Sequence, residues 1–148
     1  EEGARIHNLA ASVFDSGWIE KIEHEGRPVL ILLEGAAMYF SEEEMRSLFA
    51  MLAEAFADAS MFIEIMPPFL ISQQKHHDSV DTQKAPFQWG AKSGKEIERL
   101  HPAIAFLKER TLYEGFRCRW GLFGLLSVIP WWNKNCNDKI ACLHFAAR

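Results

Sequence analysis

Residues 28–56 read PVLILLEGAAMYFSEEEMRSLFAMLAEAF, and this stretch decides the fold class. The run 29–33 is apolar without interruption, follows Pro28 and ends at Glu34 and Gly35. Such a run is typical of a strand that is buried on both faces. We therefore expect a central strand of a largely parallel sheet.

A well-marked helix is expected to begin at Glu42. Ser41 is a favourable N-cap residue and Glu44 stands three positions later, as a capping box requires, while Phe40 and Met45 occupy the two positions of a hydrophobic staple. Apolar side chains then recur at helical spacing, at Met45, Leu48, Phe49, Leu52, Ala53 and Phe56. This stripe predicts a helix that packs one face on the sheet.

The loop 34–40 between these two elements is the first candidate for a binding site. It follows the carboxyl end of a strand, which is the edge where open α/β sheets bind ligands. Glu34 comes directly after five apolar residues, so its carboxylate is expected to face a cleft or a cationic partner. The alternative is that Glu34 is a strand-end residue that reaches water or caps a nearby helix.

Size and charge restrict the classes of protein and partner. With 148 residues, 49% hydrophobic and 24% charged, the chain fits one globular domain with a substantial core. The net charge is −4 and no basic run occurs, so nucleic acid is not an expected partner. Small acidic or neutral molecules fit better.

The cysteines and the apolar runs bear on the compartment. Cys118, Cys136 and Cys142 are odd in number and form no C-x-x-C pair, so we expect neither a disulfide framework nor a zinc ribbon. The longest apolar stretch, 120–132, is shorter than the ~20 residues of a membrane-spanning helix. No signal peptide is expected before Ile6. These patterns predict a cytoplasmic protein without a membrane partner.

The remaining elements alternate. Strands are predicted at 5–13, 61–66, 105–112 and 139–146, and helices at 17–22, 69–74, 94–101 and 120–129. On the last strand Ile140, Cys142 and His144 share one face, and Ala141, Leu143 and Phe145 share the other. The order indicates an α/β fold with a largely parallel sheet, in which the last strand can be inserted antiparallel.

One part of a nucleotide-binding fold is missing from this chain. None of its nine glycines forms a G-x-G-x-x-G turn, which normally cradles the ligand at a helix N-terminus. The chain therefore looks like the second half of such a fold. Residues 75–90 are polar and irregular, and we expect the segment 75–92 to act as a lid or substrate loop.

Several motifs together resemble a known family. They are AASVFD at 10–15 with WI at 18–19, RPVLILLEGAAMYFSEEE at 27–44, KHHD at 75–78, APFQWG at 85–90, EIERLHP at 96–102 and RWG at 119–121. The chain resembles the S-adenosylmethionine-dependent methyltransferases of the leucine carboxyl methyltransferase superfamily, in the branch related to the tetracenomycin polyketide O-methyltransferase. The similarity extends over nearly the whole chain.

The resemblance implies the C-terminal part of a class I, Rossmann-like methyltransferase sheet with strand order 3-2-1-4-5-7-6. On that template 5–13 is strand 3, 29–33 is strand 4, 61–66 is strand 5, and 105–112 and 139–146 are strands 6 and 7. Strands 1 and 2, which carry the glycine turn and the acid for the ribose, are absent. Residues 1–148 then form a single, partial methyltransferase domain that is inactive alone.

The resemblance also implies a set of cofactor-binding residues for S-adenosylmethionine. Ser12 and Val13 match positions that contact the adenine, although the family often has Asp where Ser12 stands. Asp15 matches the acid at the end of that motif and could take over its role. Glu34 and Gly35 match the contact near the methionine part of the cofactor.

Substrate contacts are expected at Met38, Tyr39, His76 and His77, with a small-molecule carboxylate or hydroxyl, polyketide-like acceptor. A carboxylate acceptor needs no general base, whereas a hydroxyl or phenol does. No residue stands out as that base, and only His76, His77 and His144 are candidates. No metal site is expected.

A second hypothesis belongs to another class of protein. The chain could be a non-catalytic α/β interaction module or an inactive methyltransferase-like domain, whose partner covers an exposed strand edge. Without strands 1 and 2 the strand at 29–33 has an open edge, so a homo-oligomer formed through this edge is a possible assembly.

Overall fold

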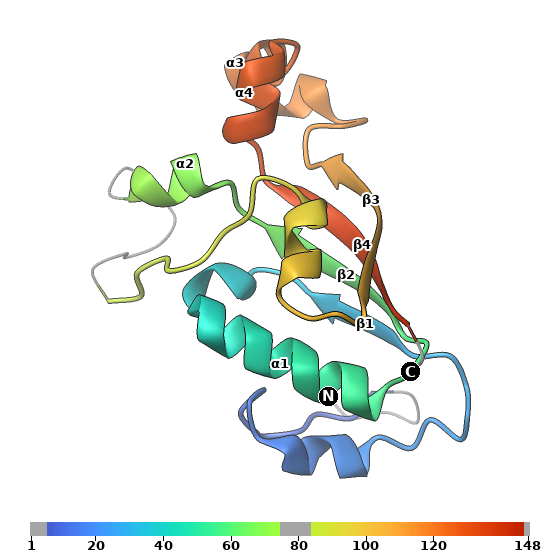
Figure 1. Cartoon of the computed structure of the whole chain (residues 1–148). Coiled ribbons are helices and arrows are strands. Elements are labelled where there is room, and N and C mark those ends of the chain that lie inside the picture. The colour runs from blue at the N-terminus through green and yellow to red at the C-terminus, as the bar shows by residue number, and fades with distance from the viewer. Residues whose placement is uncertain (1–5, 75–83, 147–148) are drawn as a thin grey trace.

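The computed structural model describes residues 6–74 and 84–146 as a mixed four-stranded sheet with helices. The strands are β1 (Leu30–Leu33), β2 (Ser60–Ile65), β3 (Ile104–Thr111) and β4 (Lys139–Phe145), and their order in the sheet is β1-β2-β4-β3. The α/β class is thus confirmed (Figure 1). None of the helices in these two described ranges is long and apolar enough to cross a membrane.

The helix α1 (Glu42–Ala55) is the main element on one face of the sheet (Figure 1). It begins where the sequence predicts, and its capping box is complete: Glu44 N–H donates to Ser41 Oγ, and Ser41 N–H donates to Glu44 Oε2. Its predicted stripe is buried at Met45, Leu48, Phe49 and Leu52. Helix and cap are therefore determined locally by residues 41–56.

The strand pairings combine both directions, so the prediction of a largely parallel sheet is wrong. β1 and β2 are parallel, with Ile31 opposite Met61 and Leu33 opposite Ile63. β4 lies between β2 and β3 and is antiparallel to both, as expected for the last strand. Because β4 is antiparallel to β2, its first residues lie beside the carboxyl end of β2. Residue 139 is the first of them, opposite Ile65.

The two faces of the sheet differ in burial. The face under α1 carries Met61, Ile63, Ala141, Leu143 and Phe145, each fully buried. These three β4 residues are the ones predicted to share a face. The opposite face, which we call the open face, exposes four large apolar side chains: Leu30, Leu32, Phe62 and Leu107.

The prediction that the 29–33 strand is central and buried on both faces is wrong. β1 is an edge strand among the described residues, and Leu32 is 69% exposed. The apolar run reflects one face that packs under α1 through Ile31 and Leu33 and a second face without cover.

The predicted strand at 5–13 is also absent from the described residues. Apart from a single bridge residue, Ile6, the segment 6–15 is irregular and mostly exposed. Its backbone turns at Ser12, whose carbonyl accepts from Asp15 N–H and whose Oγ accepts from Phe14 N–H. A strand needs a paired neighbour, and these local hydrogen bonds compete with pairing. The short 3-10 helix η1 (Ser16–Lys21) then follows near the predicted place.

Helical segments later in the chain are shorter than predicted. Residues 94–101 form a 3-10 helix, η4 (Gly94–Arg99), beside α1 on the covered face (Figure 1). Ser93 and Glu96 have the spacing of a capping box, but the box is not formed: Ser93 makes no side-chain cap, and Glu96 accepts from Lys92 N–H. α2 (Pro68–Ser72) agrees with prediction within two residues.

The apolar segment 120–129 is not one buried helix. It begins at the last residue of η5 (Arg117–Trp120) and contains α3 (Gly121–Leu126), and Pro130 begins α4 (Pro130–Asn135). Most of its large apolar side chains are exposed, with Leu122 at 68% and Leu125 at 67%. These helices lie beyond the end of the sheet (Figure 1), so no sheet surface covers them.

Candidate functional site

The turn after β1 is open to ligands at the carboxyl edge of the parallel pair. Gly35 has φ of +66°, a conformation that favours glycine, and a Cβ added there would meet no other atom within 4 Å. Glu34 is exposed, and within the described chain its carboxylate makes no hydrogen bond or ion pair. Both groups can therefore be approached from outside.

Glu64 on β2 holds this turn in place. Its Oε2 accepts from the N–H of Gly35 at 2.8 Å, although the two residues are 29 positions apart. Glu64 lies on the open face, because its neighbours Ile63 and Ile65 are fully buried on the other. Glu64 lies within the strand predicted at 61–66, and no site role was predicted for it.

Residues 87–91 cross the carboxyl edge as a tightly fitted segment. The N–H groups of Gln88 and Trp89 donate to the carbonyl of Met38, at 2.7 and 3.3 Å, and Ala91 N–H donates to the carbonyl of Met66 at 3.1 Å. At Gly90 a Cβ would lie only 2.3 Å from the Met66 carbonyl oxygen. The loops that follow β1 and β2 are thereby joined.

Met38 and Tyr39, the expected substrate contacts, pack within the protein. Met38 is buried in a small apolar cluster with Met66 and Phe87, and the half-buried Tyr39 packs its ring edge-on against Phe87 at 5.3 Å. Tyr39 also offers its carbonyl to Gln88 Nε2 at 2.6 Å. Both residues shape the wall of the edge.

The expected adenine-binding residues lie near the start of α1. The ring of Phe14 contacts Phe40 edge-on at 4.9 Å, which brings 12–15 beside the loop 34–40. Ser12 is exposed, whereas Val13 packs partly against the main core. Asp15 Oδ1 accepts from Gly17 N–H at 3.0 Å and so caps η1.

Asp138 is a third acid near this edge, after Glu34 and Glu64. It directly precedes β4, and its carbonyl accepts from Leu112 N–H at 3.0 Å. Its side-chain Oδ1 is buried and has no hydrogen-bond partner in the described chain. Burial raises the pKa of Asp138 to about 7; the charge of Glu64 adds to this, and Lys139 acts in the opposite direction.

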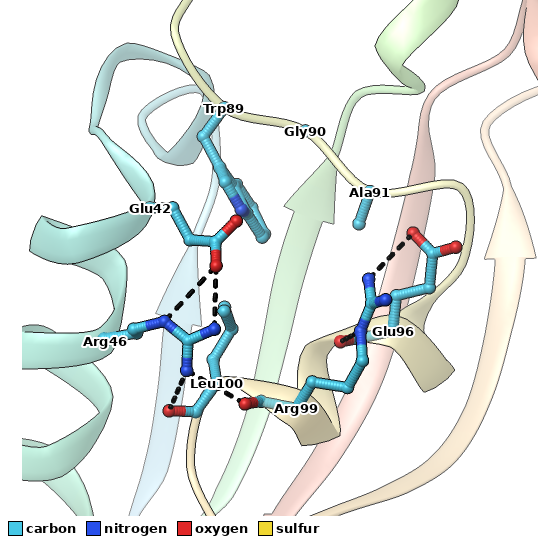
Figure 2. A pocket seen from close by; sticks show the side chains of 8 residues that line it. All are labelled: Glu42, Arg46, Trp89, Gly90, Ala91, Glu96, Arg99 and Leu100. Carbon is cyan, nitrogen blue, oxygen red and sulfur yellow. Dashed lines mark hydrogen bonds and ion pairs between the residues drawn. The ribbon is translucent and has the colours of Figure 1, made fainter.

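A cavity of about 200 Å³ opens between α1 and η4, and Figure 2 shows that its charged groups face one another. Arg46 donates to Glu42 Oε1 and, through Nη1, to the carbonyls of Arg99 and Leu100. Arg99 donates to the carbonyl of Glu96 and lies 3.7 Å from its carboxylate. Because both guanidinium groups already have protein partners, the cavity is a structural junction.

A larger pocket of about 410 Å³ contains the buried Lys139. Its Nζ donates to the carbonyls of Lys92 and Lys134, and burial lowers its pKa while Glu109 opposes the shift. Lys139 thus connects the segment before η4, at Lys92, to α4, at Lys134. We assign it a structural role.

Only one of the three candidate histidines, His144, lies within the described residues. His76 and His77 lie outside the described residues. His144 is near the far end of β4, where its Nε2 lies 3.2 Å from Asp58 Oδ1, so it is partnered but only half-buried. Within the described ranges no three or more His, Cys, Asp or Glu side chains form a possible metal site.

Sequence reasoning missed Asp138 as a site residue. The available signal was an acid directly before an apolar strand, but its position at the carboxyl edge depends on β4 being antiparallel and next to β2. That register follows from tertiary pairing and not from local sequence.

The chain was also compared with known proteins. No protein-family model matches it, and no curated protein gives a significant match.

Proposed function

We propose that the chain is the C-terminal part of an S-adenosylmethionine-dependent O-methyltransferase that acts on a small-molecule acceptor. The observation that carries this proposal is the strand order β1-β2-β4-β3, in which the last strand is inserted antiparallel. It supports reading these strands as 4, 5, 7 and 6 of a class I methyltransferase sheet. Strands 1 and 2 would come from residues upstream of this chain.

The donor set at the edge fits part of such a cofactor. Exposed carboxylates at Asp15 and Glu34 can accept hydrogen bonds from amino and hydroxyl groups, and the open space at Gly35 lets a ligand approach the backbone. Ser12 and Val13 are the residues proposed to contact the adenine of the cofactor. When bound, the sulfonium supplies an electrophilic methyl group, and the protein aligns donor and acceptor.

The test is calorimetric titration of S-adenosylhomocysteine into this chain and into the protein encoded by the complete reading frame. We expect binding by the longer protein and weaker or no binding by these 148 residues. Glu34→Ala should weaken binding about tenfold or more, the loss of a charge-assisted hydrogen bond. Glu54→Ala, an exposed glutamate on α1, is the matched control. No binding by either protein would refute the proposal.

A second candidate is a non-catalytic interaction module, and the open face favours it. Leu30 is 56% exposed and Leu32 is 69% exposed, both on a strand without a partner on one edge among the described residues. Such edges pair readily with a second copy of the chain. Light scattering checks this: a dimer that Leu32→Glu dissociates would support self-association through β1, and a monodisperse monomer would contradict it.

A further inference from the structure

The carboxyl edge contains a half-buried acid, Asp138, with one buried carboxyl oxygen that makes no hydrogen bond within the described chain. The backbone of Asp138 is fixed by the hydrogen bond from Leu112, but no described residue donates to its buried Oδ1. A buried carboxyl oxygen without a donor costs stability, so its persistence calls for another role.

The register places this acid beside the proposed cofactor turn. Lys139 is opposite Ile65, so Asp138 adjoins the end of β2, and Ile140 is opposite Glu64. Alternation along the strand puts Asp138 on the same face as Ile140 and Glu64. Glu64 also accepts from Gly35 N–H. The same glutamate side chain therefore lies between Asp138 and the turn at Gly35.

The surroundings of Asp138 favour a proton acceptor. Glu64 faces it from β2, and its negative charge makes proton uptake more favourable. Lys139 is adjacent but directs its Nζ to two backbone carbonyls. Burial raises the pKa of Tyr113, on the loop after β3, and the charge of Asp138 adds to this. The Tyr113 hydroxyl donates to the Cys136 carbonyl at 3.4 Å, and not to Asp138. The carboxylate is therefore not neutralised by a hydrogen-bonded partner.

We propose that Asp138 is the general base of the methyl transfer, and that the acceptor is consequently a hydroxyl or phenol rather than a carboxylate. This inference rests on the proposed function. As the acceptor oxygen attacks the methyl carbon, its O–H bond breaks and Asp138 takes the proton. The carbon–sulfur bond breaks with its electron pair returning to sulfur, so the sulfonium becomes a neutral thioether.

A base with a pKa near the working pH is effective because it is ionised yet still basic. The raised pKa of Asp138 meets this condition, whereas an ordinary aspartate would be a much weaker base at neutral pH. A carboxylate acceptor is already ionised at neutral pH, so its methylation needs no general base.

The first measurement is the titration of the Asp138 carboxyl by carbon-detected NMR, with Asp138→Asn for assignment. A midpoint near neutral pH, moved to lower pH by Glu64→Gln, supports the inference. Gln can still accept from Gly35 N–H, so this variant removes charge and keeps the hydrogen bond. A midpoint at the ordinary value for Asp, or one indifferent to Glu64→Gln, would overturn it.

The second measurement is methyl transfer by the complete-reading-frame protein to a hydroxynaphthoic acid, whose phenol and carboxyl lie on different rings. We expect a methyl ether, a rate that rises with ionisation of Asp138, and a loss of about 100-fold or more in Asp138→Asn. Asp58→Asn, at the opposite edge of the sheet, should keep the rate. A methyl ester as product, or full activity of Asp138→Asn, would overturn the inference.

Calorimetry separates the two levels of the proposal. Asp138→Asn should bind S-adenosylhomocysteine as tightly as wild type does, because the base contacts the acceptor and not the cofactor. If wild type fails to bind, the proposed function fails and the base role with it. If wild type binds and Asp138→Asn transfers methyl normally, only the base role fails.

Discussion

The two faces of the sheet differ in what they contribute. Under α1, the side chains of β2 and β4 are fully buried, whereas on the open face Leu30, Leu32 and Phe62 remain exposed on neighbouring strands. The open face also carries Glu64, and Asp138 adjoins it. The buried contacts that stabilise the fold are therefore concentrated on the covered face, and the candidate site acids Glu64 and Asp138 lie on the other.

The largest effect is expected where the covered face is deepest. Phe49 on α1 is fully buried and packs near the ring of Phe145, at 6.3 Å between centroids. Phe49→Ala should lower the free energy of unfolding by about 3–5 kcal/mol, because it leaves a cavity. Urea denaturation measures this, with Glu54→Ala on the exposed side of the same helix as control. A loss below about 1 kcal/mol would contradict the assignment of the core.

The next largest effect concerns Asp138 and depends on pH. The folded-state pKa of about 7 lies above the ordinary 3.8, so the folded protein binds more protons between these values. Its free energy of unfolding should therefore fall as pH rises from about 4 to about 7, by at most about 4 kcal/mol.

Asp138→Asn should remove this part of the pH dependence and make the protein relatively more stable at pH 8 than wild type. Thermal denaturation across the range checks the slope. Glu64→Gln serves as a partial version, since it should move the midpoint to lower pH. An unchanged slope in Asp138→Asn would show that another group causes it.

A smaller effect tests the capping box on the covered side. Ser41→Ala removes the acceptor for Glu44 N–H and should cost about 1 kcal/mol. Ser47, exposed within the same helix, is the matched control, and Ser47→Ala should be slightly stabilising because Ala favours helix. Equal effects of the two substitutions on the denaturation midpoint would contradict a specific role of the cap.

The smallest effect is expected on the open face. Leu32 is 69% exposed, so Leu32→Gln should change the free energy of unfolding by no more than about 0.5 kcal/mol. A loss of about 2 kcal/mol or more would mean that another surface covers this face in solution. The loss should then be measured over a range of protein concentrations. A loss that depends on concentration means that a second copy covers the face, and a loss that does not means that the chain itself does.

Local signals were sufficient for several parts of the fold. The capping box and apolar stripe predicted α1 to the residue at its start, and alternation predicted which β4 residues share a face. Gly35 was placed in a turn at a strand end. In each case the decisive interactions join residues a few positions apart, so they are visible in the order of the chain.

Other features depend on partners far away in sequence. Residues 7–13 look like a strand in sequence but form none, and 120–129 is apolar but lies beyond the sheet. Ser93 and Glu96 have capping-box spacing, yet the Glu96 carboxylate accepts from Lys92 N–H instead. Propensity proposes such elements, and tertiary contacts decide whether they form.

The sequence by itself determined the α/β class, the four strands that form, the α1 helix and the turn with Glu34 and Gly35. Only the tertiary structure decided that β4 lies between β2 and β3, that β1 is an edge, and that Asp138 adjoins the carboxyl edge near Glu64. The reason is physical: helix caps and apolar periodicity arise from neighbours along the chain. Strand order, burial of a face and the pKa of an acid arise from groups that only folding brings together.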